Sequence, residues 1–250
     1  MTGPLLSFAR FPVVAVVRIA VLSDIHSNLE ALERALQAVE RAGVDAVYCL
    51  GDIVGYNADP GPCVDLVRRH CDGVVRGNHD AVVATAASRD ALPPDGQEAA
   101  RHNRHHLTED QLAYLAGLPL TITAENCTFV HATPDEPTVW KRMTTYPDAQ
   151  SQFEHFDTEM CFFGHTHVPA VMADQLGVFQ VRRGHRFLVN VGSVGQPRDQ
   201  NPKLSLGLFD TEAFEYRNVR ISYDVDGAAQ KIREDEALPD RLATRLYDGL

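Results

Sequence analysis

Five short polar groups in this 250-residue sequence each follow an apolar stretch, and all contain side chains that bind divalent cations. Three groups lie in the first third of the chain and two in its second half. So many carboxylate, amide and imidazole donors suit two cations held side by side, an arrangement that serves catalysis rather than structural support. The groups are Asp24-Ile25-His26, Gly51-Asp52, Gly77-Asn78-His79-Asp80, the isolated His131, and Gly164-His165-Thr166-His167.

The spacing within the groups indicates how the donors divide between two cations. In the first group the middle side chain of an extended segment points to the opposite face, so Asp24 and His26 face the same cation. Asp52 follows the next apolar segment, where a carboxylate can bridge two cations about 3.5 to 4 Å apart. His165 and His167 alternate in the same way, so one imidazole is available to each cation.

Apolar periodicity places the early groups at strand ends. Residues 18–23 and 46–50 and the short segment 73–75 are typical of buried strands, and residues 28–42 and 61–70 have helical spacing. Alternation of strand and helix favours a parallel sheet, in which ligands bind beyond the carboxyl ends of the strands. The first three groups are therefore expected at one edge of a sheet.

The sequence changes character after residue 80. Residues 81–119 predict a helical cap beside the active edge, with helices at 97–106 and 108–116, and short strands follow. Many strands after a strand–helix half indicate a second sheet stacked on the first. We expect one domain, 18–250, after an N-terminal extension, 1–17. The later strands are predicted at 120–123, 127–130, 160–163, 168–172, 178–182, 187–191, 204–210 and 213–221, and terminal helices at 226–232 and 238–246.

Composition restricts the partners. The formal net charge of −11 repels nucleic-acid duplexes and anionic membranes, so we expect neither as a partner. The expected partner is a small phosphate-ester substrate.

The five cysteines are scattered and include no C-x-x-C pair, which favours small buried side chains in a reducing compartment. The first 17 residues have the composition of neither a signal peptide nor a membrane span, so a cytoplasmic location is expected. The oligomeric state is left open.

The five ordered motifs, D-x-H, G-D, G-N-H-D, V-H-A and G-H-T-H, closely resemble those of the calcineurin-like metallophosphoesterase superfamily, over residues 18 to about 210. The resemblance implies an α/β (α+β) fold, namely a four-layer αββα sandwich of two stacked mixed β-sheets with a dinuclear metal site at the C-terminal strand edge. It also implies two ligand sets that share one carboxylate. These are Asp24, His26, Asp52 and His167 for the first metal, and Asp52, Asn78, His131 and His165 for the second.

The same resemblance implies cleavage of P–O bonds by in-line attack of a hydroxide that both metals share. His79 is not needed as a ligand and is expected to donate a proton to the leaving group, while Asp80 orients it and favours its protonated form. Asp80 has an alternative role as a cap of the following helix. Manganese is the expected metal, with iron or zinc as alternatives, and magnesium suits so many imidazoles less well.

A second segment resembles a bacterial branch of the superfamily. Residues 190–199 match N-P-G-S-V-G-Q-P-R, with Val191 in place of the usual proline. Arg198 is expected to pair with a substrate phosphate, and Gly192 and Gly195 to let backbone amides approach the site. The alternative is a turn that packs beneath the motifs. Tyr56 and Asn78 are further substrate-binding candidates, although Tyr56 also suits an ordered loop.

Residues 101–106, which are rich in Arg and His, suit either a basic patch that faces the phosphate or a solvated helix face.

Three functions stay open. The first is a phosphodiesterase acting on nucleotides or similar diesters, typical of the small bacterial branch. The second is a phosphomonoesterase acting on phosphoproteins or nucleotides. The third is a non-catalytic scaffold on the same fold, like the retromer subunit, and loss of motif residues would mark it. No motif residue is lost here.

Overall fold

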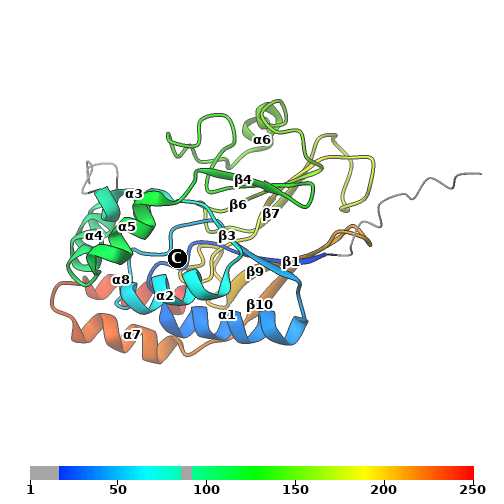
Figure 1. The fold of residues 1–250 in the computed structure, drawn as a ribbon. Coiled ribbons are helices and arrows are strands. Elements are labelled where there is room, and N and C mark those ends of the chain that lie inside the picture. The colour runs from blue at the N-terminus through cyan, green and yellow to red at the C-terminus, as the bar shows by residue number, and fades with distance from the viewer. Residues whose placement is uncertain (1–16, 86–91) are drawn as a thin grey trace, which may run out of the picture.

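Two five-stranded sheets lie face to face in the computed structural model, with helices on their outer sides (Figure 1). The structure describes residues 17–85 and 92–250. The predicted extension at residues 1–17 therefore lies, apart from Val17, outside the described residues. Helix, sheet, sheet and helix follow one another across the molecule, which confirms the predicted four-layer αββα arrangement.

The first sheet has the strand order β10-β9-β1-β2-β3. Its centre is parallel, because β1 pairs with β2 and β2 with β3 in the same direction, whereas β9 and β10 run antiparallel. The three strands that precede the early motifs therefore end at the same edge. The bounds are β1 Arg18–Leu22, β2 Ala46–Cys49, β3 Gly73–Val74, β9 Leu204–Asp210 and β10 Glu215–Ile221.

The second sheet has the order β4-β5-β6-β8-β7. Its three central strands are parallel and its two edge strands antiparallel. Strands β5 and β6 precede the two late motifs. Because these strands are parallel, both motifs lie at the same edge of this sheet. The bounds are β4 Thr121–Ala124, β5 Cys127–Val130, β6 Met160–Phe163, β7 Ala170–Ala173 and β8 Phe187–Asn190.

Apolar side chains of both sheets fill the space between them. Tyr48 stacks on Phe129 with ring centroids 4.0 Å apart, and Ile19, Val21 and Phe162 are buried in the same cluster. Burial of such side chains stabilises a fold by about 1.5–3 kcal/mol each. The packed interface fixes the position of one sheet on the other, and with it the distance between early and late motifs.

Helices cover the outer faces. Asn28 caps α1 by accepting from the amide of Ala31, and Gly43 ends it in the left-handed conformation. Helix α6 covers the second sheet through Ala149 and Phe153. The bounds are α1 Leu29–Ala42, α2 Pro60–His70, α3 Asn78–Thr85, α4 Pro94–His105, α5 Glu109–Gly117, α6 Tyr146–Gln152, α7 Val225–Glu234 and α8 Asp240–Asp248.

Two predicted features differ from the structure. The strand expected at 178–182 is irregular, and Phe179 within it is 93% exposed, because Gly177 and Gly184 form turns on either side. Helix α6 was not predicted, although Thr145 and Asp148 form a capping box at its start. The predicted cap, residues 81–119, contains most of α3 together with α4 and α5, which pack on one another at one end of the first sheet.

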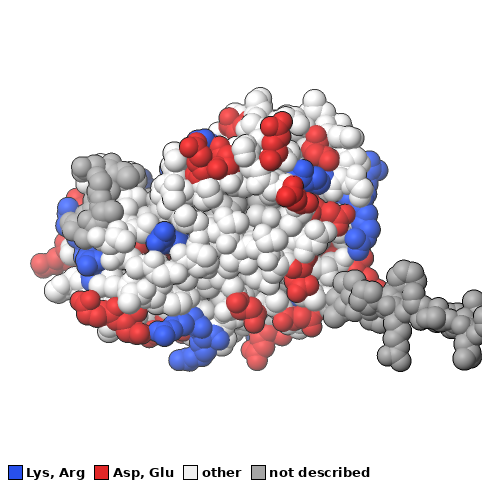
Figure 2. Space-filling view, turned by 45° about the horizontal axis from the view of Figure 1, so that its top comes forward, with Lys and Arg blue, Asp and Glu red and all other residues white. Residues whose placement is uncertain are grey.

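Surface charge agrees with the acidic composition. Figure 2 shows Asp and Glu side chains around the margins of one face and a broad uncharged area between them. All five cysteines are free, and four of them are buried. Within residues 17–85 and 92–250, no helix has the length and apolar character needed to cross a bilayer.

Candidate metal centre

The donor residues stand on turns that directly follow the strands. Asp24, His26, Asp52, His165 and His167 all have positive φ angles between 50° and 65°, a region that non-glycine residues seldom adopt. Such backbone conformations persist where the surrounding structure enforces them, and they cluster at functional sites.

Glycines allow these turns to pack together. A Cβ atom on Gly164 would overlap the side chains of Ser23 and Asp24, and one on Gly77 would overlap Asp52. Only glycine therefore lets the turn after β6 approach the turn after β1, and the turn after β3 approach the turn after β2. The motif glycines contribute to the site by bringing donors from separate strands into contact.

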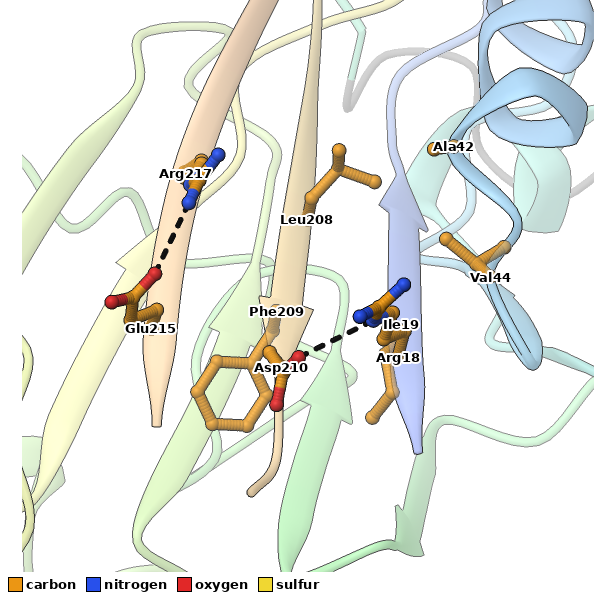
Figure 3. A pocket seen from close by; sticks show the side chains of 9 residues that line it. All are labelled: Arg18, Ile19, Ala42, Val44, Leu208, Phe209, Asp210, Glu215 and Arg217. Atoms are coloured by element: carbon orange, nitrogen blue, oxygen red, sulfur yellow. Dashed lines mark hydrogen bonds and ion pairs between the residues drawn. The ribbon is translucent and has the colours of Figure 1, made fainter. Parts of the chain in front are cut away.

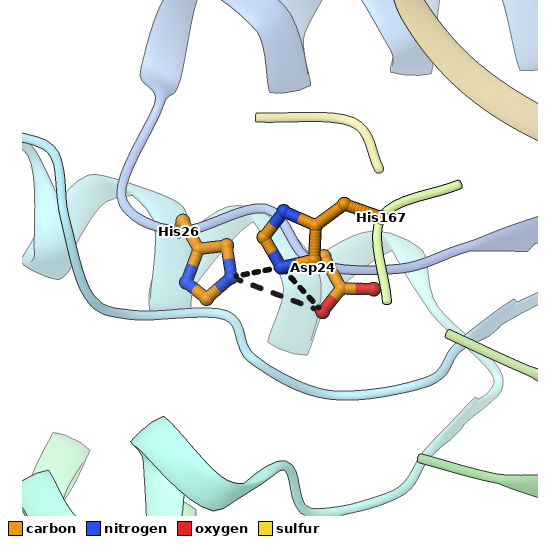
Figure 4. A group of neighbouring side chains, drawn as sticks. All are labelled: Asp24, His26 and His167. Carbon is orange, nitrogen blue, oxygen red and sulfur yellow. Dashed lines mark hydrogen bonds and ion pairs between the residues drawn. The ribbon is translucent and has the colours of Figure 1, made fainter. Parts of the chain in front are cut away.

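Asp24, His26 and His167 form one buried donor group (Figure 4). The Nε2 atoms of His26 and His167 are 3.1 Å apart, and Asp24 Oδ1 lies 3.8 Å from the first and 3.3 Å from the second. His167 lies 141 positions after His26 in the sequence. The stacked sheets bring them into a single cluster, as the ligand assignment requires.

The imidazole tautomers leave the inward-facing nitrogens without protons. Nδ1 of His26 lies 3.0 Å from the carbonyl oxygen of Val54, and Nδ1 of His167 lies 2.5 Å from that of Gln196. A carbonyl only accepts, so each Nδ1 carries the proton and donates it. Two Nε2 lone pairs therefore face each other, and a cation between them resolves their repulsion.

The carboxylates of Asp24 and Asp52 resemble the imidazoles, because the protein binds one donor atom of each and leaves the other facing the donor groups. Asp24 Oδ2 accepts from the Ser23 hydroxyl and from the His165 amide, at 2.7 and 2.9 Å, while its buried Oδ1 accepts no hydrogen bond. Asp52 Oδ1 accepts from the amide of His79 at 2.8 Å, and its Oδ2 faces imidazoles. Each carboxylate thus has one oxygen fixed by the protein and one directed at the donor group. A buried oxygen without a partner is costly unless a cation binds it.

Asp52, His131 and His165 form the second donor group. Asp52 Oδ2 lies 3.4 Å from Nε2 of His131 and 3.7 Å from Nε2 of His26, so this carboxylate lies between the two groups. Asn78 Oδ1 is 3.1 Å from Nε2 of His131, whose Nδ1 donates to the Leu50 carbonyl at 2.7 Å. The seven residues assigned as ligands from the sequence all lie in these two adjoining groups, and their donor types fit two divalent cations.

The pKa shifts show that the donor groups attract positive charge. Burial would lower the pKa of His131, but the adjacent Asp52 carboxylate raises it to about 9. Burial would likewise raise the pKa of Asp24, but the His167 imidazole brings it below its usual range. Burial lowers the pKa of His165 to about 3. His165 is thus kept neutral and Asp24 ionised, which are the forms that bind metals, whereas a cation that binds His131 must displace its proton.

His79 and Asp80 do not form the expected pair. Asp80 Oδ1 accepts from the amides of Ile53 and Val54 at 2.9 and 3.2 Å, and its Oδ2 accepts from the Gly77 amide at 3.0 Å. His79 Nδ1 is buried without a hydrogen bond, and burial lowers the pKa of His79 to about 4. The expectation that Asp80 orients His79 and favours its protonated form is therefore wrong. Asp80 instead links the start of α3 to the turn after β2.

A cavity of about 210 Å³ opens beside the two donor groups. His79 lines it, and so do both substrate-binding candidates outside the ligand set, Tyr56 and Arg198. The Arg198 guanidinium lies 5.5 Å from the centre of the Tyr56 ring and donates to Gln196 Oε1 at 3.0 Å. It is therefore held in place beside the donors. The cavity is lined by Asp52, Tyr56, Asn78, His79, Val82, Leu92, Pro93, Val139, Trp140, Arg142, His165, His167 and Arg198.

Sequence reasoning missed one wall of this cavity. Val139, Trp140 and Arg142 lie in the connection between β5 and α6, which has no regular secondary structure. No motif, periodicity or cluster of donors identifies these residues. The one indication in the sequence is their position shortly after His131, because the chain that follows a metal ligand begins at the edge of the site.

The glycine-rich segment after β8 packs beneath the first motif. Val194 and Gly195 donate their backbone amides to the carbonyls of Ser23 and Asp24, at 2.9 and 3.0 Å. The Gly195 amide thus approaches the site at the Asp24 carbonyl, and the alternative of a turn that packs beneath the motifs describes the segment. Only its end, at Arg198, reaches the cavity.

Residues 101–106 do not form a basic patch at the cavity, since none of them lines it. Arg104 donates to the carbonyls of Val83 and Ala84 near the end of α3. The buried Asn103 contributes instead to the turns that carry the donors. Its Oδ1 accepts from Ser27 and from the Gly55 amide, and its Nδ2 donates to the Asn57 carbonyl at 3.0 Å.

A larger hollow of about 380 Å³ lies at the start of β1, at the other end of this strand from Asp24 (Figure 3). Arg18 pairs with Asp210 at 3.3 Å and Arg217 with Glu215 at 3.2 Å, so these lining charges are already neutralised. Among the residues that the structure describes, no imidazole, amide or hydroxyl side chain lines it. Size alone therefore does not identify the reactive site, and the donor chemistry places it in the smaller cavity.

Similar proteins share this architecture. A metallophosphoesterase from Sphaerobacter thermophilus is 35% identical, with a TM-score of 0.82, and the match covers 94% of this chain and 99% of that one. An uncharacterized protein of Methanocaldococcus jannaschii is 37% identical over 92% of this chain and 98% of its own length. A hypothetical protein of Pyrococcus horikoshii shares the fold, with a TM-score of 0.79 at 22% identity and coverage of 94% and 99%.

The two-sheet sandwich with a carboxylate and imidazole donor set at its edge places the protein among metal-binding proteins of mixed α/β architecture. The model of the calcineurin-like phosphoesterase superfamily domain matches residues 17–213, and this chain belongs to that superfamily. It is therefore a metallophosphoesterase, a hydrolase of phosphoric ester bonds that uses divalent metals.

Proposed function

We propose that the protein is a phosphodiesterase that uses two divalent cations, manganese first among them, bound by the two donor groups around Asp52. The observation that carries the proposal is the shape of the cavity beside those donors. Apolar side chains line it from the cap, at Val82, Leu92 and Pro93, and from the loop after β5, at Val139 and Trp140. A phosphorus atom held at the donors would then have two apolar surfaces available for organic substituents, one from the cap and one from the loop. A monoester, with a single substituent, would use only one of them.

Charge around the cavity supports the same choice. Arg198 is the fixed cation beside the donors, and the other basic lining residue, Arg142, is exposed. A diester carries one negative charge and a monoester close to two at neutral pH, so the monoester requires more positive charge near phosphorus. When bound, the cations supply an activated water and neutralise charge on the phosphate oxygens.

The chain's own residues have separate roles in this proposal. The backbone turns hold seven ligands, Arg198 pairs with a phosphate oxygen, and Tyr56 supports its guanidinium. In this proposal His79, which lines the cavity, donates a proton to the leaving group, and the negative charge of a bound phosphate raises its pKa from the value of about 4 that burial gives it. Such proton transfer contributes about 10²–10⁴-fold to a rate.

A substrate panel tests the proposal. Linear diesters, 2′,3′- and 3′,5′-cyclic nucleotides, monoesters and phosphopeptides are assayed on chelated protein and again after reloading with Mn²⁺. We expect activity only after reloading, with the highest kcat/KM on diesters. Activity that survives complete metal removal would contradict the metal-dependent mechanism, and a higher kcat/KM on monoesters would make the protein a phosphomonoesterase.

A further inference from the structure

The outer wall of the cavity carries the only tryptophan of the sequence. The Trp140 ring is partly exposed and meets the His131 ring edge-on, with centroids 5.8 Å apart and an angle of 73° between the planes. His131 belongs to the second donor group, so the indole lies directly beside the place where a phosphate would bind. A substituent on that phosphate would reach the indole.

The neighbours of Trp140 show which side chains this loop offers to the cavity. Lys141 does not line the cavity, and its amine pairs with Asp135 and Glu136, at 2.6 Å each. Arg142 does line it, and it has no ion pair or hydrogen bond among residues 17–85 and 92–250. The loop thus presents one flat ring and one uncommitted cation to the cavity, and its other cation is already neutralised.

The cap contributes apolar side chains to the same cavity. Val82 and Leu92 are buried, and Pro93 is exposed at the rim before α4. A flat ring that contacted both these side chains and the indole would lose water from both of its faces. Aromatic pairs of this kind add about 0.5–1.5 kcal/mol beyond the area that they bury, and stacking of a base on an aromatic side chain adds about 1–3 kcal/mol.

We propose that Trp140 forms a subsite for a planar aromatic substituent of the substrate, of which a nucleobase is the commonest example. The subsite deepens the proposed function, on which it rests, because the donors position the phosphate to which the ring is attached. The uncommitted Arg142 beside the indole adds attraction for an anionic nucleotide.

Two ligands that differ only in the ring test the subsite. Adenosine 5′-monophosphate and ribose 5-phosphate share the sugar and the phosphate, and both are titrated into Mn²⁺-loaded protein by calorimetry. We expect the nucleotide to bind about tenfold more tightly, in line with base stacking. The intrinsic fluorescence arises from Trp140 alone among tryptophans, so the nucleotide should quench it far more than the sugar phosphate does.

Variants separate the indole from general changes in folding. In Trp140→Leu the tenfold preference for the nucleotide should fall to near one, and in Trp140→Phe most of it should remain. Phe179→Leu is the matched control, because Phe179 is 93% exposed and does not line the cavity. Thermal unfolding of each variant verifies that the affinity ratio is compared between folded proteins.

Each outcome decides the subsite. Equal binding of the two ligands, no binding of either, or a preference that persists in Trp140→Leu overturns it. A protein that hydrolyses no diester but still prefers the nucleotide through Trp140 loses the proposed function and keeps the subsite. A protein that hydrolyses diesters and binds both ligands equally keeps the function and loses the subsite.

Discussion

The inner and outer parts of the cavity differ in how firmly their side chains are held. At the inner end, both donor carboxylates have one oxygen fixed by the protein, and three imidazoles donate Nδ1 to backbone carbonyls. At the outer end, Arg142 is exposed, and Val139 is 54% exposed. The inner part is arranged before any ligand arrives, whereas the outer part has exposed polar and apolar groups that a ligand can contact.

This difference separates reaction from selectivity. In the proposed function, fixed donors would hold cations and a phosphate in one geometry, which would determine the bond that is cleaved. The looser wall after β5 would contact the part of the substrate that does not react, which would determine the molecule that is accepted. Substitutions at the inner end should therefore reduce metal binding or kcat, and those at the outer end should change KM and ligand preference.

Asp52→Asn should have the largest effect, because Asp52 is the carboxylate that lies between both donor groups. Loss of its charge removes several kcal/mol of stabilisation, and we expect kcat/KM on a diester to fall at least about 10³-fold. Metal content per chain, measured by mass spectrometry, should fall with it. The surface variant Asp45→Asn is the control. Full metal content and full activity in Asp52→Asn would show that the fixed inner end does not determine metal binding and turnover. The difference between the two ends of the cavity would then have no functional meaning.

His79→Ala should reduce turnover about 10²-fold or more on an alkyl ester while both metals remain bound. An activated aryl ester, whose leaving group needs no proton, should lose much less. The measurement is the ratio of kcat values on the two esters for wild type and variant. An equal loss on both esters would show that His79 is not the proton donor.

Arg198→Ala should raise KM about tenfold or more with metal content unchanged, because a hydrogen bond to a charged group contributes about 1.5–3 kcal/mol. Arg198 stands where the two parts of the cavity meet. Steady-state kinetics on a diester with parallel metal analysis makes the test, with the exposed Arg101→Ala as the control. Unchanged kinetics would mean that Arg198 contacts no substrate.

Asn103→Ala should weaken metal binding about 10-fold, the lower end of the effect of residues that orient ligands. Asn103 is buried and holds the turns around Ser27, Gly55 and Asn57, and Asn57 in turn donates to the His26 carbonyl at 2.7 Å. The dissociation constant for Mn²⁺ is measured by calorimetry, and thermal unfolding is recorded separately. A variant that is less stable but binds Mn²⁺ as wild type does would give Asn103 a purely structural role.

The inner end could be predicted from the sequence and the outer end could not. Donors such as Asp24 and His167 recur in ordered motifs at strand ends, so the sequence predicts both their chemistry and their convergence. Trp140 and Arg142 lie on an irregular loop whose path depends on packing that no periodicity reveals. The role expected for Asp80 was wrong for a similar reason. Adjacency in the sequence suggested a contact with His79, but the first turn of α3 directs the carboxylate to Ile53 and Val54.

The most direct test of the two donor groups is the number of cations that each chain binds. Chelated protein is titrated with Mn²⁺ by calorimetry, and metal content is then counted by mass spectrometry after removal of the excess. Two adjoining groups that share Asp52 predict two Mn²⁺ per chain in wild type and fewer in Asp52→Asn. One or no tightly bound cation in the wild-type chain would contradict the account.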